Sequence, residues 1–295
     1  RHPDVPMLAA EQDFEMHGHA FRAGAFIIPN ADRATLEPTL IELGLSAWAT
    51  DGRPNVTTHE LDVPRIGYIH SWQRTQDEGW VRAALDNYGV PYDYFADQEL
   101  RKGDLRARYD VIIYPHVGGN VRSQINGISM RGELPLPYKK TRETPNFGYM
   151  DESDDIRGGM GLEGLLQLTQ FVREGGTLIV EGSTSAILPE LGVTPQVSIE
   201  NPNELISPGS IHRGIIADKA SPISYGYDGD QLPVYFKGDV VMSVSQGGEM
   251  GRFRRFFNRN SPWQNTTPMA NRPELSPFKD PAPSSRDLGR TDTES

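Results

Sequence analysis

The sequence predicts an α/β fold with a doubly wound parallel sheet, because strand and helix patterns alternate within residues 63–250. Short apolar runs typical of buried strands occur at 65–70, 92–95, 109–114 and 177–180. Segments with apolar residues at helical spacing lie between them, and this alternation indicates βαβ units. The chain has 30 glycines and 23 prolines among 295 residues. That composition favours an ordered core that carries long loops.

Residues 1–62 are expected to be the end of a preceding region, a small α/β remnant, followed by a linker. Residues 21–29 predict a short strand, and a helix should follow and end at Leu43. Pro38 fits only the first turn of that helix, and Gly44 suits its C-terminal stop. Residues 47–62 are polar and rich in turn-forming types, which predicts the linker. The chain begins with Arg1, so we expect a segment of a longer polypeptide.

The first strand of the core, Arg65–His70, leads into a predicted helix. Thr75 and Glu78 have the spacing of a capping box, in which each side chain bonds the other residue's backbone amide. The apolar positions at helical spacing, expected on one buried face, are Val81, Ala84, Leu85 and Tyr88. Gly89 should end this helix. A strand at 92–95 and a helical turn at 97–102 are expected next.

Residues 117–157 show no hydrophobic period, and we expect an inserted surface loop there. Periodicity returns in an amphipathic helix that should end at Gly175–Gly176; its expected core positions are Leu162, Leu165, Leu166, Thr169 and Val172. Beyond Leu188 the sequence predicts only short β pieces at 210–216, 234–236 and 240–244. Residues 251–295 are rich in Asn, Pro and Ser, which predicts a disordered tail.

Composition excludes several classes of function. A net charge of −11 disfavours non-specific binding to nucleic acid and attraction to anionic membranes. No apolar run approaches the roughly 20 residues that a membrane span needs. The absence of cysteine rules out disulfides, thiolate metal sites and cysteine nucleophiles.

The turn after the last predicted core strand is the first candidate site. The strand runs into Glu181-Gly-Ser-Thr-Ser185, so Ser183 stands where a nucleophile elbow would present its side chain. His116 follows the strand at 109–114 and would lie at the same sheet edge, because parallel strands end on one edge. The Gly-x-Ser-x-Gly pattern is absent, and a carboxylate at Glu181 disfavours an oxyanion nearby. We therefore prefer a structural turn with a loop histidine.

His17 and His19 are the second candidate, as a metal site. Both imidazoles would lie on one face of a strand, and Glu11, Asp13 and Glu15 precede them. Gly18 and the polar surroundings favour a solvated loop instead. No cofactor site is expected: the glycines at 118–119 and 158–161 match neither the P-loop nor the dinucleotide pattern.

Several motifs together resemble a C-terminal domain of large bacterial zinc carboxypeptidases, a class I glutamine amidotransferase-like domain. They are Ile66-Gly-Tyr-Ile-His-Ser-Trp72, Asp77-Glu-Gly-Trp-Val-Arg82, Tyr88-Gly-Val-Pro-Tyr92, Tyr109-Asp-Val-Ile-Ile-Tyr-Pro115, Gly161-Leu-Glu-Gly164 and Phe171-Val-Arg-Glu-Gly-Gly-Thr-Leu178. The match spans roughly residues 21–244. The resemblance implies a flavodoxin-like sheet and a turn at 181–185 that presents a catalytic cysteine in related enzymes. This chain has none.

The resemblance also implies a parent that is a zinc metallocarboxypeptidase. Its catalytic centre needs a His-x-x-Glu pair and a further His on zinc, and none of the seven histidines here begins such a pair. Zinc is therefore expected in an upstream domain and not in this segment. The implied partners are that peptidase domain and its peptide substrate, in the periplasm or outside the cell.

We therefore expect a non-catalytic accessory module that supports proteolysis by the upstream domain. Two alternatives stay open. One is a degenerate amidotransferase-like hydrolase that uses Ser183 and His116, which must then converge. The other is a module that binds a peptide or a glycan, which requires a cleft lined by the 117–157 insertion.

Overall fold

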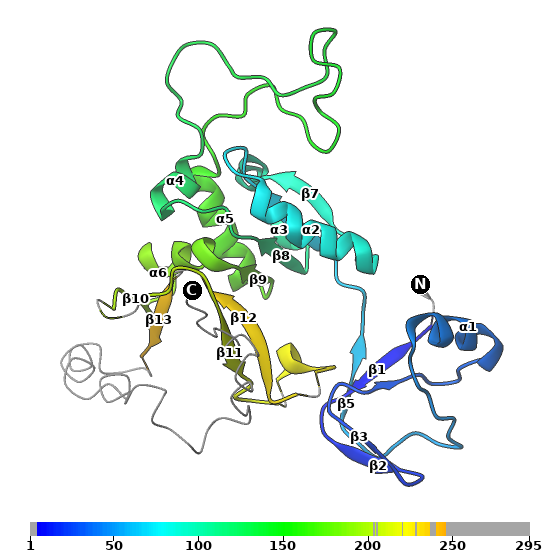
Figure 1. The fold of residues 1–295 in the computed structure, drawn as a ribbon. Coiled ribbons are helices and arrows are strands. Elements are labelled where there is room, and N and C mark those ends of the chain that lie inside the picture. Colours follow the sequence, from blue (N-terminus) through cyan, green and yellow to red (C-terminus); the bar gives the residue numbers. More distant parts are fainter. Residues whose placement is uncertain are drawn as a thin grey trace, which may run out of the picture. The chain divides into compact units, whose positions relative to one another are not determined.

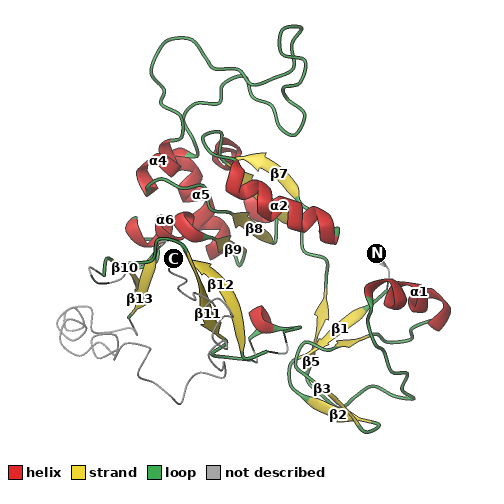
Figure 2. Ribbon diagram, in the orientation of Figure 1, coloured by secondary structure: helices red, strands yellow, loops and turns green. Residues whose placement is uncertain are grey.

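A computed structural model describes residues 5–245, apart from residues 203, 205, 220, 228 and 237–239. At its centre is a four-stranded parallel sheet in the order β7-β6-β8-β9 (Figures 1 and 2). The strands are β6 (Ile66–His70), β7 (Asp93–Ala96), β8 (Val111–Tyr114) and β9 (Thr177–Val180). Helices flank this sheet, so the prediction of an α/β fold with a parallel core is confirmed.

One face of the sheet packs against the helix α5 (Gly161–Arg173). The buried side chains of α5 are Leu165, Leu168 and Phe171, and Gly164 gives the helix its close approach. A Cβ atom on Gly164 would lie 3.1 Å from the Cβ atom of Leu100, in the 3₁₀ helix η1 (Asp97–Lys102). A short helix, α3 (Leu105–Arg108), completes this layer.

The predicted buried face of α5 was only partly right. Leu165 is buried and Thr169 is half-buried, but Leu162, Leu166 and Val172 are exposed. The apolar spacing predicted an amphipathic helix correctly. The helix face that packs on the core, however, includes Gly164, which contacts η1, and is rotated from the predicted face. Glycine has no apolar side chain, so the spacing of apolar residues did not include it.

The helix α2 (Gln76–Tyr88) ends at Gly89 in the left-handed conformation, as predicted, but its start differs. Thr75 makes no side-chain capping bond, and the Glu78 side chain is buried instead. Val81 and Leu85 are half-buried, whereas Ala84 and Tyr88 are exposed. The predicted capping box is therefore wrong, because the sheet offers Glu78 a tyrosine hydroxyl as a partner.

The N-terminal part contains more structure than predicted. The strands β1 (Met7–Ala10), β4 (Phe26–Ile27) and β5 (Thr58–Leu61) form an antiparallel sheet, while β2 (Phe14–Met16) pairs with β3 (His19–Phe21). Residues 58–61 are therefore a strand and not part of a linker. They pair with the edge of β1, and the polar sequence of residues 58–61 did not predict this pairing.

The helix α1 (Arg33–Leu43) is capped by the Asp32 carboxylate and ends at Gly44 in the left-handed conformation. Pro38 is its sixth residue, which corrects the prediction that proline fits only in the first turn. A proline at this position removes one intrahelical hydrogen bond. Because no residue of this helix is buried, the loss disturbs no core packing.

The insertion begins with a helix, α4 (Val121–Asn126), which corrects the prediction of a structureless 117–157. Asn120 and Ser123 cap it reciprocally, and Val121, Gln124 and Ile125 are buried. The rest is an extended loop between α4 and α5 (Figure 1). Two isolated bridges hold it, one between Ile128 and Arg157 and one between Tyr138 and Ser153.

After β9 the chain forms η2 (Gly182–Ala186) and α6 (Ile187–Glu190). The later elements are β10 (Val197–Glu200), which pairs with β13 (Val241–Val244), and β11 (Ser210–Ile215), which pairs antiparallel with β12 (Gln231–Phe236) around η3 (Pro222–Ser224). The short β pieces predicted after Leu188 are thus confirmed. The predicted disordered tail, residues 251–295, lies outside the described residues.

Candidate functional site

His70 is the last residue of β6 and is buried. Successive strand residues point to opposite faces, so Tyr68 and His70 share the face that α2 covers. The hydroxyl of Tyr68 donates to the backbone oxygen of Glu78 at 2.8 Å, which fixes the first turn of α2 over this face. The strand therefore delivers an imidazole to the carboxyl end of the sheet, beneath the start of a helix.

Three side chains hold the His70 ring. Its Nε2 atom lies 2.7 Å from the Oδ2 atom of Asp151, in the insertion, and that oxygen also accepts the Ala96 N–H at 3.0 Å. Tyr94 stacks on the ring with centroids 4.4 Å apart, and Trp72 meets it edge-on at 4.7 Å. Because the carboxylate accepts from Nε2–H, we assign the lone pair of the neutral ring to Nδ1.

Glu78 contributes a buried carboxyl group to the same region. Its Oε1 atom accepts a hydrogen bond from the Tyr94 hydroxyl at 2.8 Å. Burial raises the pKa of Glu78, while that hydrogen bond and the nearby Arg82 charge act in the opposite direction. The guanidinium of Arg82 lies 4.1 Å from the Tyr94 ring centroid, so a cation contacts the ring that also stacks on His70.

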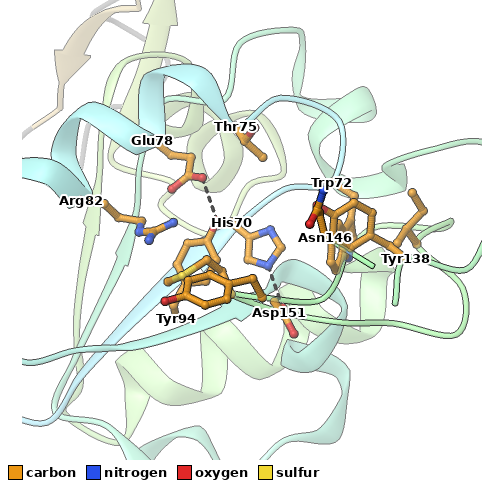
Figure 3. A pocket seen from close by; sticks show the side chains of 13 residues that line it. His70, Trp72, Thr75, Glu78, Arg82, Tyr94, Tyr138, Asn146 and Asp151 are labelled. Carbon is orange, nitrogen blue, oxygen red and sulfur yellow. Dashed lines mark hydrogen bonds and ion pairs between the residues drawn. The ribbon is translucent and has the colours of Figure 1, made fainter. Parts of the chain in front are cut away.

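These groups line a cavity of about 500 Å³, which is within the range of small-molecule sites (Figure 3). Its walls come from β6, α2, β7 and the insertion: His70, Trp72, Thr75, Glu78, Gly79, Arg82, Tyr94, Tyr138, Asn146, Tyr149, Met150, Asp151 and Ile156. Among the described residues, three of its buried atoms have no hydrogen-bonding partner: Nδ1 of His70, Nε1 of Trp72 and Oε2 of Glu78. Such atoms are rare in proteins and are often found at binding sites.

The structure brings the predicted elbow residues together without forming a catalytic pair. The Ser183 backbone N–H donates to Nδ1 of His116 at 3.1 Å, and the Ser183 hydroxyl oxygen accepts the Gly118 N–H at 2.9 Å. His116 Nε2 lies 3.8 Å from a carboxylate oxygen of Asp77. The imidazole lone pair on Nδ1 therefore faces a backbone amide and not the Ser183 hydroxyl.

The turn itself is built by Thr184. Its hydroxyl donates to the Tyr114 carbonyl at 2.8 Å, and it accepts the Glu181 N–H at 3.1 Å. Burial raises the pKa of Glu181, with His116 acting in the opposite direction. A carboxyl group in this position offers no donor to a developing oxyanion when ionised.

His17 and His19 are both exposed, at the turn and in β3. His17 has a positive φ of 51°, and the His19 ring lies against Trp48 with centroids 4.8 Å apart. Across the described ranges, no group of three or more His, Cys, Asp or Glu side chains is arranged to hold a metal ion.

Sequence reasoning missed the cavity. His70 ends the first core strand, and ligands of parallel sheets bind at the carboxyl ends of strands. This position was the signal in the sequence that could have indicated a binding site near His70. Glu78 was assigned to a helix cap, which is the usual role of a carboxylate at that spacing. Asp151 lies in a segment without periodicity, where no local pattern marks a residue that contacts a distant strand.

Comparison of the chain with protein-family models, with curated proteins and with solved structures found no match. None of the helices in the described part of the chain has the length and apolar character that a bilayer crossing requires.

Proposed function

We propose that this chain is a non-catalytic accessory module of a zinc metallocarboxypeptidase, and that it binds a peptide or a glycan in the cavity beside His70. One observation carries this proposal: the insertion supplies a wall of the cavity through Tyr138, Asn146 and Asp151. A module that binds a peptide or a glycan was expected to need a cleft lined by the 117–157 insertion. The module would position substrate for a peptidase domain upstream, in the periplasm or outside the cell.

The proposed fold is a flavodoxin-like, doubly wound sheet. In chain order the observed strands run 2-1-3-4, which corresponds to the first four strands of the flavodoxin order. In such sheets ligands bind where neighbouring strands send their connections to opposite faces. Here that place lies between β6 and β8. His70 ends β6, while the second strand that lines the cavity is β7.

Zinc is proposed for the upstream domain. The described residues do not fit a zinc site, since they contain no suitable cluster of imidazoles and carboxylates. We expect less than one equivalent of metal to remain on this chain after dialysis, and no release of C-terminal residues from peptides. Zinc bound at one equivalent would contradict this part of the proposal.

The competing proposal is a degenerate hydrolase at Ser183. The observation in its favour is the proximity of His116 and Ser183 across two strand ends. We prefer the binding role because the hydroxyl of Ser183 accepts a backbone hydrogen bond and His116 bonds a backbone amide.

Isothermal titration calorimetry against a panel of peptides and oligosaccharides tests the binding role. We expect saturable binding by the wild-type chain and a loss of at least tenfold in affinity for Tyr138→Ala. Tyr88→Ala is the matched control, because Tyr88 is an exposed tyrosine on α2 outside the cavity. The proposal fails if no ligand binds, or if Tyr138→Ala and Tyr88→Ala bind equally well.

A further inference from the structure

We infer that the cavity beside His70 recognises a sugar ring through its hydroxyl groups. This inference rests on the proposed binding function and names its ligand class. It derives from buried polar atoms on residues that line the cavity: His70 Nδ1, Trp72 Nε1 and Glu78 Oε2 have no partner among the described residues. All three side chains line the same cavity.

The three atoms form a mixed set of one donor and two acceptors. The indole N–H of Trp72 only donates. The Nδ1 atom of His70 accepts when the ring is neutral, because Asp151 engages Nε2. The second oxygen of Glu78 accepts when the group is ionised, since the first oxygen is already bonded to the Tyr94 hydroxyl. With His70 neutral and Glu78 ionised, a ligand that matches the set offers two donors and one acceptor.

Neighbouring hydroxyls on a sugar ring supply this combination, because each hydroxyl both donates and accepts. An ammonium group has only donors and would leave the Trp72 N–H without a partner. A phosphate or carboxylate ligand has acceptors that suit Arg82, but it would also meet the carboxylates of Glu78 and Asp151, and an ionised carboxylate has no donor for the two acceptors. A secondary peptide amide has a single N–H for the two acceptors.

The shape of the walls agrees with a ring-sized ligand. Trp72 and Tyr138 lie with ring centroids 5.0 Å apart at 50°, and Phe147 stacks behind Tyr138 at 4.6 Å. The electron-rich faces of such rings suit the C–H groups of a sugar. Tyr94 contacts both His70 and Arg82 and donates to Glu78, and these contacts fix its position before a ligand arrives.

The test is a screen of the wild-type chain on an array of neutral mono- and oligosaccharides, followed by calorimetry with the sugars that bind. n-Butylamine, acetamide and an unglycosylated peptide are titrated in parallel. The variants are Trp72→Phe, which removes the N–H and keeps an aromatic ring, and Glu78→Gln, which removes one acceptor. Leu166→Ala is the control, since Leu166 is exposed on α5. Thermal unfolding checks that each variant is folded.

We expect at least one neutral sugar to bind saturably, with affinity reduced at least tenfold in both Trp72→Phe and Glu78→Gln and unchanged in Leu166→Ala. Sugar binding that survives both substitutions in folded protein would overturn the inference. Binding of the peptide, the amine or acetamide without any sugar would also overturn it, while leaving a binding function in place. If nothing binds, both the inference and the proposed function fail.

Discussion

His70 and Asp151 lie 81 residues apart in the chain, yet the imidazole Nε2 atom and the carboxylate Oδ2 atom are 2.7 Å apart. The same carboxylate oxygen accepts the backbone N–H of Ala96, the last residue of β7. One side chain of the insertion is therefore bonded to the carboxyl ends of two neighbouring strands, and this contact places the insertion over the cavity.

Replacing Asp151 with alanine should release the insertion from the sheet. The substitution leaves the Ala96 N–H and the His70 ring nitrogen without their acceptor, which we expect to lower the free energy of unfolding by about 1–3 kcal/mol. Urea denaturation measures this change. Limited proteolysis should show faster cleavage within residues 128–157.

Asp154→Ala is the control for this prediction. Asp154 is exposed and pairs with Lys139 at the surface of the same loop, so its loss should change stability by less than about 0.5 kcal/mol. Equal losses for the two variants would show that Asp151 does not anchor the loop.

Leu165 and Leu166 are neighbours on α5 with opposite surroundings: the first is buried and the second is exposed. Leu165→Ala should cost about 2–5 kcal/mol through lost burial and a residual cavity. Leu166→Ala should stay within about 0.5 kcal/mol. Chemical denaturation of both variants measures the difference, and a larger loss for Leu166→Ala would contradict the observed packing of α5.

The sheet was predictable because its strands are short apolar runs bounded by turns, and buried parallel strands have this composition. The buried face of α5 was less accessible, since Gly164 contributes to packing through the absence of a side chain. Apolar periodicity considers only the apolar side chains along a helix. It does not detect a glycine that lets two elements approach closely.

The cavity depends on contacts between residues far apart in the chain. Glu78 has the spacing of a capping residue, and only the proximity of Tyr94 across the sheet shows why its carboxyl group turns inward. Asp151 lies in a loop whose course is set by tertiary contacts. Local sequence patterns carry no information on such pairs, so the sequence could indicate a strand end at His70 but not its partners.

The elbow should not react with a serine-directed phosphonate. The Ser183 hydroxyl oxygen accepts a hydrogen bond from Gly118, and Nδ1 of His116 accepts one from the Ser183 backbone, so this imidazole nitrogen is not placed to take the hydroxyl proton. Mass spectrometry of the treated wild-type chain should show no adduct. An adduct that is absent from Ser183→Ala would support the hydrolase alternative and count against the binding role.

Asp97 should make stability depend on pH. Asp97 is 1% exposed, at the start of η1, and no side chain among the described residues is hydrogen-bonded to its carboxyl group. Burial raises the pKa of Asp97 from its usual 3.8 to about 7, and the Gln98 backbone amide and the Arg101 charge only partly oppose this. Tyr114 is the other titratable neighbour.

Between pH 4 and pH 7 the folded chain therefore keeps a proton that the unfolded chain releases. The free energy of unfolding should fall as the pH rises through this window, by up to about 4 kcal/mol from this group, and level off above it. Asp97→Asn has no proton to lose at this position. Urea denaturation from pH 4.5 to pH 8, with values spaced by about half a unit, should show a smaller decline for the variant than for the wild type.

Glu99→Gln, in the same 3₁₀ helix, removes a surface carboxylate paired with Lys102 and should keep the wild-type decline. Parallel curves for the wild type and Asp97→Asn would show that Asp97 is ionised in the folded chain throughout this range.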